Sequence, residues 1–399
     1  MPPKTPSPLL AVTEARTRLF ALAPPIDTET VPIRDAAGRW AADDIRALRT
    51  QPAADLSAMD GYAIRFGDLP GPLSLIGESA AGRAFPGTVG PGETVRIFTG
   101  AAMPAGADTV LVQEEAAREG DQIMLAGEGP RNLGRNIRRK GLDFSTGDLL
   151  VAKGDRLTPA RIAVAATGGH GALPVHRRLR VAIVATGDEL VAPGTALNDS
   201  VLPESNGAML AAMLADLPVD ILNLGILPDQ LGIIASAFAR VDADILVTTG
   251  GASVGDHDLV RPALEAAGGS LDFWRIALRP GKPMMAGRLG NAVVLGLPGN
   301  PVSAFVTAFL FVRPLIAAMS GAAHPLPRTT AAILGEDLSG NDHREDYLRA
   351  ETRDGRVFSL GLQDSSMLRT LARADSLIVR RPHAPAAIAG DSVEILSIA

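Results

Sequence analysis

Between Arg180 and Val312, short apolar strands alternate with helices, and this alternation limits the choice of fold more than any other feature of the chain. The predicted strands cover residues 180–187, 219–227, 243–251, 273–278 and 292–297. The predicted helices cover residues 205–217, 229–241, 258–268 and 301–312. Buried strands that alternate with helices form a mostly parallel sheet covered on both faces. We therefore predict a three-layer α/β domain whose ligands bind at the carboxyl ends of the strands.

The flanking segments have a different pattern. Residues 51–139 contain short strands separated by Gly, Pro and Asp, which is typical of a small β domain. From about Pro325 the chain is again rich in strands. Two helices are predicted outside the α/β segment: residues 13–23 with Thr13 as N-cap, and residues 157–167 with Thr158 as N-cap and Pro159 in the first turn. The fold class is therefore multi-domain, α/β and β.

Composition excludes several kinds of site. The net charge of −6 argues against bulk nucleic-acid binding, and the absence of Cys removes thiolate nucleophiles and thiolate metal ligands. The six His residues show no zinc-ligand spacing. Any metal site must therefore consist mainly of oxygen ligands, which favours a hard ion such as Mg²⁺.

The sequence gives no sign of a membrane or export signal. The first sixteen residues contain no apolar run of signal-peptide length. The most apolar stretch, residues 302–319, is interrupted by Arg313 and Pro314, so we predict a buried helix and not a membrane span. We expect a soluble cytoplasmic protein.

The stretch TTGGASVGDHDLV, from Thr248 to Val260, follows a predicted strand and combines glycines with two acids. Glycines let the backbone approach a ligand and direct N–H groups towards an anion. Asp256 and Asp258 would repel that anion unless a cation lies between them. The stretch therefore indicates an anionic ligand held together with a metal ion. The alternative is an ordinary glycine-rich loop with two solvated acids.

Three further strand ends carry polar residues. Asp188 and Glu189 follow the first strand, Asp229 follows the second, and the sequence LPGNP (Leu297–Pro301) follows the last. There Asn300 can cap a helix that starts at Pro301 and bind a phosphate at its N-terminus. Each feature alone is explained by a turn or a cap, but four such strand ends together favour a binding site.

Two groups of cations could serve an anionic ligand. Arg275, Arg279 and Lys282 lie on and just after a predicted strand, the last two in the constrained turn RPGKP. Five cations fall within residues 131–140, and Asp143 follows them. The alternative for this second group is a solvated basic loop.

Seven motifs in this order resemble one family. They are DLSAMDGYA (Asp55–Ala63), FTGAAMPAGADTV (Phe98–Val110), NIRRKGLDF, ATGDEL, TTGGASVGDHD, RPGKP and GLPGNPVSA. Together they look like the molybdopterin molybdenumtransferases, that is, the bacterial MoeA proteins and the E domain of gephyrin. The resemblance covers nearly the whole chain.

The resemblance implies four domains and a homodimer. The domains are an elongated linker domain with helices (1–50 plus 141–178), an inserted β domain (51–140), the α/β molybdopterin-binding domain (179–324) and a C-terminal β domain (325–399). The implied reaction inserts molybdate into the dithiolene of adenylylated molybdopterin, with Mg²⁺-dependent hydrolysis of the adenylate and release of AMP. Other proteins of molybdenum cofactor biosynthesis are possible partners; nucleic acid and membranes are not expected.

The resemblance also implies roles for particular residues. The implied catalytic acids are Asp60, Asp143, Glu189, Asp229 and Asp258. The implied metal ligands are Glu189, Asp229, Asp256 and Asp258. The implied substrate-binding residues are Thr99, Gly100, Arg138, Thr186, Gly250, Gly251, Ser253, Gly255, Arg279, Lys282, Pro298, Asn300 and Pro301. The chain departs from the usual family pattern at Leu56, Leu142, Gln230 and Glu204, but all the implied acids are present.

Two other functions fit part of the pattern. A nucleotide pyrophosphatase or deamidase could use the same α/β domain, but it would not need SAMDG or RPGKP, and both are present. A non-catalytic scaffold could keep the fold without the chemistry, but the intact set of acids argues against it.

Overall fold

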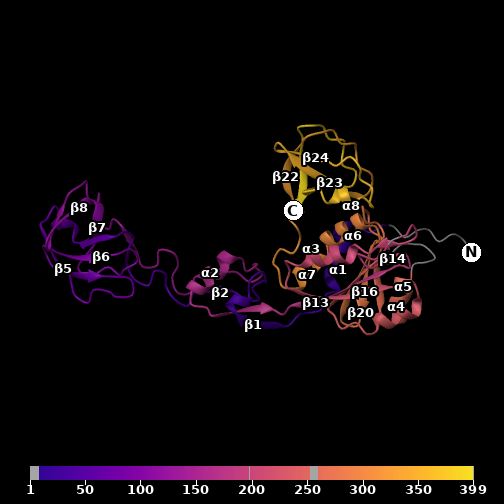
Figure 1. Ribbon diagram of the computed structural model, residues 1–399, viewed down its shortest axis with the longest axis horizontal. Coiled ribbons are helices and arrows are strands. Elements are labelled where there is room, and N and C mark those ends of the chain that lie inside the picture. Colours follow the sequence, from indigo (N-terminus) through magenta and orange to yellow (C-terminus); the bar gives the residue numbers. More distant parts are fainter. Residues whose placement is uncertain (1–8, 197, 252–258, 399) are drawn as a thin grey trace, which may run out of the picture.

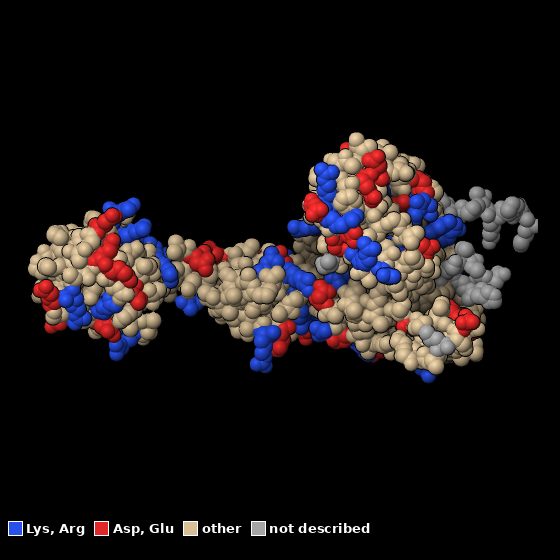
Figure 2. Space-filling model, turned by 45° about the horizontal axis from the view of Figure 1, so that its top comes forward, with Lys and Arg blue, Asp and Glu red and all other residues tan. Residues whose placement is uncertain are grey.

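A computed structural model describes residues 9–196, 198–251 and 259–398. The chain is elongated, with a β-sheet body at one end, a small middle body, and an α/β body next to a C-terminal β body at the other end (Figure 1). Figure 2 shows the first body as a separate globule on a narrow connection. The predicted fold class is confirmed, and the exact domain boundaries remain our proposal.

The β-sheet body, which we call the inserted β body, holds a six-stranded sheet of order β7-β4-β6-β5-β9-β8. Its core contains Tyr62, Ile64, Leu73, Leu111 and Ile123. A second, two-stranded pairing of β3 with β10 leads back to the middle body. The strands are β3 (Leu56–Ser57), β4 (Gly61–Ile64), β5 (Leu73–Ser79), β6 (Glu93–Ile97), β7 (Thr109–Val112), β8 (Ala116–Glu119), β9 (Gln122–Leu125) and β10 (Ile137–Arg138).

The middle body contains two antiparallel strand pairs and one helix. The pairs join β1 to β12 and β2 to β11. Thr158 caps the helix α2 as predicted, since its hydroxyl accepts a hydrogen bond from the backbone N–H of Arg161 at 3.4 Å. The elements are β1 (Thr28–Pro32), β2 (Ile45–Arg46), β11 (Leu149–Val151), α2 (Pro159–Thr167) and β12 (Ala172–His176).

The first helix, α1 (Val12–Ala21), differs from the prediction in two ways. Its N-cap position is Ala11, so Thr13 lies inside the helix and does not cap it. The helix also packs on the α/β body, because Val12, Ala15 and Leu19 belong to the core of that body. The segment 1–50 therefore does not lie wholly in the middle body.

The α/β body is built on a six-stranded sheet of order β16-β13-β17-β21-β20-β18. The first four strands are mutually parallel, and β20 is antiparallel to β21 and to β18. The mostly parallel sheet is thus confirmed, although the sequence did not predict β20. The strands are β13 (Leu179–Thr186), β16 (Val219–Leu227), β17 (Ile245–Thr249), β18 (Ser270–Trp274), β20 (Met285–Leu289) and β21 (Ala292–Leu297). A short pair, β14 (Leu190–Val191) with β15 (Leu202–Pro203), lies outside this sheet.

Helices cover both faces of this sheet, because successive side chains of a strand point to opposite faces. On β13, Val181 and Ile183 join the core under α1, α3, α6 and α7, whereas Ala182 and Val184 join the core under α4 and α5. The helices are α3 (Asn206–Leu214), α4 (Leu231–Phe238), α5 (Val260–Ala266), α6 (Pro301–Thr307) and α7 (Arg313–Met319).

The apolar run after β21 is one continuous helical stretch. The helix predicted at 301–312 extends further than expected, because α6 continues through a π-helical turn, η4 (Ala308–Val312), into α7. Pro314 has no N–H to donate to the carbonyl of Leu310, four residues earlier, and that carbonyl accepts instead from Nε of Arg16 at 3.2 Å. Among the described residues, Pro301–Met319 is the helix long and apolar enough to cross a membrane, but 78% of its most apolar window is buried inside the protein. A helix buried to this extent is a core helix, as the sequence predicted.

The C-terminal body has a six-stranded sheet of order β19-β23-β24-β22-β26-β25. Its first strand comes from the α/β segment. The single strand predicted at 273–278 divides because Arg275 has a φ of 76°, and the chain then turns out of one sheet and into the other. The elements are β19 (Leu278–Arg279), β22 (Thr330–Leu334), β23 (Glu345–Arg353), β24 (Arg356–Ser359), α8 (Leu368–Leu371), β25 (Ser376–Arg380) and β26 (Ser392–Ser397). Short 3₁₀ turns, η1 (Ile33–Asp35), η2 (Phe66–Asp68) and η3 (Gln113–Glu115), complete the fold.

Candidate active site

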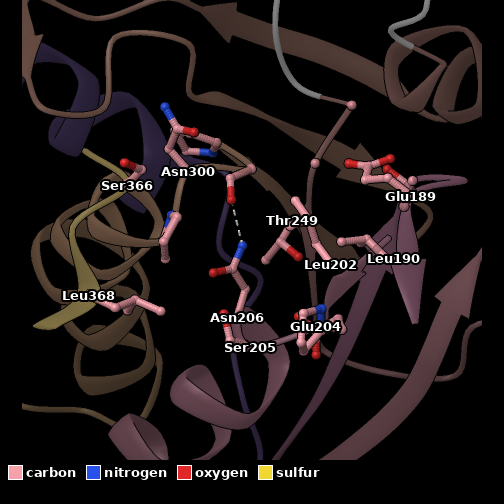
Figure 3. A pocket seen from close by; sticks show the side chains of 18 of the residues that line it. Glu189, Leu190, Leu202, Glu204, Ser205, Asn206, Thr249, Asn300, Ser366 and Leu368 are labelled. Carbon is pink, nitrogen blue, oxygen red and sulfur yellow. Dashed lines mark hydrogen bonds between the residues drawn. The ribbon is translucent and has the colours of Figure 1, made fainter. Parts of the chain in front are cut away.

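A cavity of about 820 Å³ opens at the carboxyl edge of the parallel strands. The loops after β13, β16, β17 and β21 meet there because these four strands are neighbours with the same direction. Figure 3 labels side chains from the ends of β13, β17 and β21, from α3 and from the C-terminal body around the space. The lining residues are Thr186, Gly187, Glu189, Leu190, Leu202, Pro203, Glu204, Ser205, Asn206, Asp229, Thr249, Gly250, Gly251, Pro283, Pro298, Gly299, Asn300, Pro301, Ser366 and Leu368.

The structure brings together eight of the residues proposed from the sequence. Each of the four strand ends contributes at least one of them to the cavity wall. They are Thr186, Glu189, Asp229, Gly250, Gly251, Pro298, Asn300 and Pro301. Ser253, Gly255, Asp256 and Asp258 lie outside the described residues.

Gly250 shows why the loop after β17 needs glycine. Its φ is 85°, and a Cβ added there would lie 2.4 Å from the carbonyl oxygen of Thr186. No other residue fits this position without moving the backbone. The loop therefore passes close to the end of β13 and leaves its own backbone exposed to the cavity.

Asn300 does not act as the sequence suggested. It occupies the N-cap position of α6, but its side chain makes no capping bond. Its amide Nδ2 instead donates to the hydroxyl of Ser365 at 2.8 Å, and the backbone N–H of Val302 donates to the carbonyl of Ser365 at 3.0 Å. The first turn of α6 is thus tied to the C-terminal body, and the N–H of Val302 is already occupied.

Of the four acids predicted to bind the metal, the described part of the cavity wall contains two, Glu189 and Asp229. Glu189 is exposed, and the backbone N–H of Asp229 donates to the Asp188 carboxylate at 3.0 Å. Within residues 9–196, 198–251 and 259–398, no three His, Asp or Glu side chains are grouped so that they could hold a metal ion. The other two predicted ligands, Asp256 and Asp258, belong to the segment that is not described.

Sequence reasoning missed the wall formed by α3 and the C-terminal body. Asn206 starts α3, and its Nδ2 donates to the carbonyl of Gly299 at 2.8 Å (Figure 3). Its Oδ1 and the hydroxyl of Thr186 are buried and have no hydrogen-bond partner among the described residues, so each is a polar atom that a ligand can satisfy. Ser366 and Leu368 come from a distant part of the chain, and no local motif marked them.

The predicted cations of the RPGKP turn do not line the cavity. Arg279 donates to Asp346 at 2.9 Å and also pairs with Asp342, and both acids belong to the C-terminal body. Lys282 is exposed, and its neighbour Pro283 reaches the cavity wall. Hydrogen bonds from Arg344 and the charge of Arg279 hold the pKa of Asp342 below its usual range, whereas burial raises the pKa of Asp346. Arg279, on β19, is therefore held by two acids of the C-terminal body whose sheet β19 joins.

Three further predicted residues, Asp60, Thr99 and Gly100, form a second cluster at the inserted β body. Asp60 accepts two hydrogen bonds on Oδ1, from the backbone N–H of Thr99 at 2.7 Å and from the Thr99 hydroxyl at 2.9 Å. These bonds, together with the positive charge of Arg96, lower the pKa of Asp60. The N–H of Gly100 donates to the carbonyl of Ser57 at 2.9 Å. Asp60 is thus a carboxylate held in one orientation and ionised at neutral pH.

Arg138 lies on β10, and Asp143 lies in the loop that follows this strand. Arg138 pairs with Leu56 across the β3–β10 pairing, and its side chain is exposed. Asp143 is also exposed. The inserted β body and the α/β body occupy opposite ends of the molecule (Figure 1), so one chain does not bring Asp60 to its own cavity.

Comparisons with known proteins agree with this architecture over almost the whole chain. A family model of the MoeA N-terminal region (domain I and II) matches residues 10–169, and one of a probable molybdopterin binding domain matches residues 182–318. A model of the MoeA C-terminal region (domain IV) matches residues 331–398. Fold and cavity thus define a multi-domain transferase of molybdenum cofactor biosynthesis.

Individual relatives narrow the assignment. The molybdopterin molybdenumtransferase of Haemophilus influenzae is 36% identical over 97% of this chain and 98% of the relative. That of Bacillus subtilis is 32% identical over 99% of this chain and 95% of the relative. A crystal structure of the molybdopterin biosynthesis MoeA protein from Pyrococcus horikoshii superposes with a TM-score of 0.82 at 29% identity, covering 98% of this chain and all of that one. The chain belongs to the MoeA family of molybdopterin molybdenumtransferases.

Proposed function

We propose that this enzyme inserts molybdate into the dithiolene of adenylylated molybdopterin and releases AMP. The observation that carries the proposal is the convergence of four strand-end loops on one cavity of about 820 Å³. That volume lies in the range of about 300–1,000 Å³ that is usual for ligand sites. Backbone of the glycine loop suits the pyrophosphate, and the apolar side chains of Leu190, Leu202 and Leu368 suit flat rings.

The proposed reaction needs no sulfur ligand from the protein, which fits a chain without Cys. Water adds its oxygen to phosphorus, the phosphoanhydride bond breaks, and AMP leaves with the bridging oxygen. The two thiol groups of molybdopterin then replace one oxide of molybdate, which leaves as water with the two thiol protons. Metal and sulfur keep their oxidation states, so no redox partner is required.

Carboxylates at the cavity would hold Mg²⁺. Glu189 and Asp229 belong to the described wall, and Asp256 and Asp258 complete the proposed set. All these donors are oxygen atoms, which is the ligand type that a hard divalent ion requires. When bound, the ion supplies charge neutralisation to the pyrophosphate. The protein's own part is to hold the substrate still and to place water at phosphorus.

The cations have unequal parts in this proposal. Arg138 and Lys282 are exposed, and we assign them contacts to molybdate or phosphate. Arg279 is already paired with Asp342 and Asp346, so its proposed oxyanion contact has to compete with two carboxylates. Asp143 lies near Arg138 in the chain and would orient it or the substrate.

The complete site is proposed to form between two copies of the chain. Asp60 and the cavity lie at opposite ends of one elongated molecule (Figure 1). A twofold dimer can place the inserted β body of each copy over the cavity of the other, and every contact then occurs twice. The proposal includes a cytoplasmic location and exchange of the small-molecule substrates with other proteins of cofactor biosynthesis.

The direct test is AMP release from adenylylated molybdopterin, measured with and without molybdate and Mg²⁺. We expect AMP and molybdenum cofactor in equal amounts when both additions are present. In excess chelator we expect AMP release to fall on the order of 100-fold, because the pyrophosphate charge is no longer neutralised. Added Mg²⁺ should restore the rate. Full AMP release in chelator would contradict the metal proposal, and AMP release without cofactor formation would favour a simple pyrophosphatase.

A further inference from the structure

Arg96 lies in the inserted β body and contacts every chain segment that holds Asp60. It belongs to β6, directly opposite Tyr62 on β4. The central strand of the three, β4, separates β6 from β7. The Arg96 guanidinium therefore extends across β4 towards the end of β7.

Two hydrogen bonds fix the guanidinium, one to β4 and one to the residue that follows β7. Its Nη1 donates to the carbonyl of Gly61 at 3.1 Å, and its Nη2 donates to Oε1 of Gln113 at 2.6 Å. Gly61 directly follows Asp60, and the backbone N–H of Gln113 donates to the Asp60 carbonyl at 3.1 Å. Arg96 thus binds the residue after Asp60 and the residue that holds the Asp60 backbone.

The guanidinium of Arg96 also lies over two aromatic rings. The guanidinium carbon lies 5.0 Å from the ring centre of Tyr62 and 4.9 Å from that of Phe98. Both distances are within the range of cation–π attraction. Phe98 directly precedes Thr99, which donates both hydrogen bonds to the Asp60 carboxylate. The third segment around Asp60 is therefore also held by Arg96.

We propose that Arg96 is a positioning residue for the reaction, acting through Asp60: it fixes the three segments that orient the Asp60 carboxylate and holds a positive charge beside it. A planar guanidinium is required because one group must make two hydrogen bonds in fixed directions and also lie over two rings. Lys keeps the positive charge but cannot make the two hydrogen bonds in the fixed directions of a guanidinium. The inference rests on the proposed role of Asp60 in molybdate insertion.

The experiment measures Asp60 itself as well as the reaction. The full-length protein is labelled with ¹³C at the Asp carboxyl groups, and the Asp60 signal is identified by its loss in Asp60→Asn. Its titration is followed in the wild-type protein, in Arg96→Met and in Arg96→Lys. Arg118→Met is the matched control, because Arg118 lies on β8 of the same body and bonds only to Gly120 and Asp121 among the described residues.

We expect Arg96→Met to raise the pKa of Asp60 towards its ordinary value and to lower kcat for molybdate insertion on the order of 10- to 100-fold, with little change in KM. The acid side of the pH–rate profile should move to higher pH in the same variant. Arg96→Lys should keep the Asp60 titration near that of the wild type and recover only part of kcat. Arg118→Met should match the wild type in every measurement.

Two results would overturn the proposal. One is an Asp60 titration that is the same in Arg96→Met and the wild type, even if the variant is slower or less stable, since Arg96 would then be a general structural residue. The other is a full kcat in Arg96→Met. A fully active Asp60→Asn would instead refute the catalytic use of Asp60, and the titration would still decide whether Arg96 positions it.

Discussion

Asp60→Ala and Glu189→Ala variants, each inactive alone, should regain about a quarter of wild-type activity when they are unfolded and refolded together. Asp60 lies in the inserted β body, and Glu189 lines the cavity of the α/β body at the other end of the chain (Figure 1). Random pairing makes half of the dimers mixed. Each mixed dimer has one site with both defects and one site with neither, so a quarter of all sites are intact.

The controls separate complementation from refolding yield. Each variant is refolded alone, and the wild-type protein is refolded under the same conditions to set the reference activity. Two different affinity tags allow the mixed dimers to be isolated and counted. If both acids served one site from the same chain, mixing would restore nothing. Inactive mixed dimers, shown to be present and folded, would rule out the shared site.

The regular part of the fold followed from the sequence because its pattern is local. The strands β16 and β21 begin and end where the sequence predicted. For β21 the reason is its burial, since all its residues are buried and a strand covered on both faces is apolar at every position. The strand β20 was missed because it is the antiparallel member of the sheet and lies close to the prolines of the RPGKP turn. The division of 273–278 into β18 and β19 depends on one residue with left-handed backbone, Arg275, and on pairing with β23. In that pairing Arg279 lies opposite Asp346, 67 positions later in the chain.

The candidate site was predictable only where strand ends bring residues together. Neighbouring parallel strands end at the same edge, and so Thr186, Asp229 and Gly250 meet although they are distant in sequence. Ser366 and Leu368 reach the cavity because a separate body docks there, and no periodicity encodes that docking. The partners of Asn300 and Arg279 were missed for the same reason, since both bond to the C-terminal body.

Asp60→Asn should lower molybdate insertion about 100-fold or more, the size expected when a charged group acts in proton transfer or in orienting a reactant. The substitution keeps the shape and the Oδ1 atom that accepts both hydrogen bonds from Thr99. It removes only the negative charge. Because those bonds and Arg96 lower the pKa of Asp60, the native side chain is ionised at neutral pH and loses its charge only as the pH falls through that lowered value.

Folding should hardly change in this variant, because Asp60 is a partly exposed loop acid outside the core and Asn keeps the oxygen that accepts from Thr99. We therefore expect a melting temperature within about 2 °C of the wild type. Asp121→Asn is the matched control: this acid lies in the same body, 81% of its side chain is exposed, and it faces Arg118 at 3.7 Å, away from Asp60. The control should keep full activity. A fully active Asp60→Asn would count against the assignment of Asp60. A variant that is inactive only because it melts at a lower temperature would also count against it, since the Asp60 charge would then serve the fold and not the reaction.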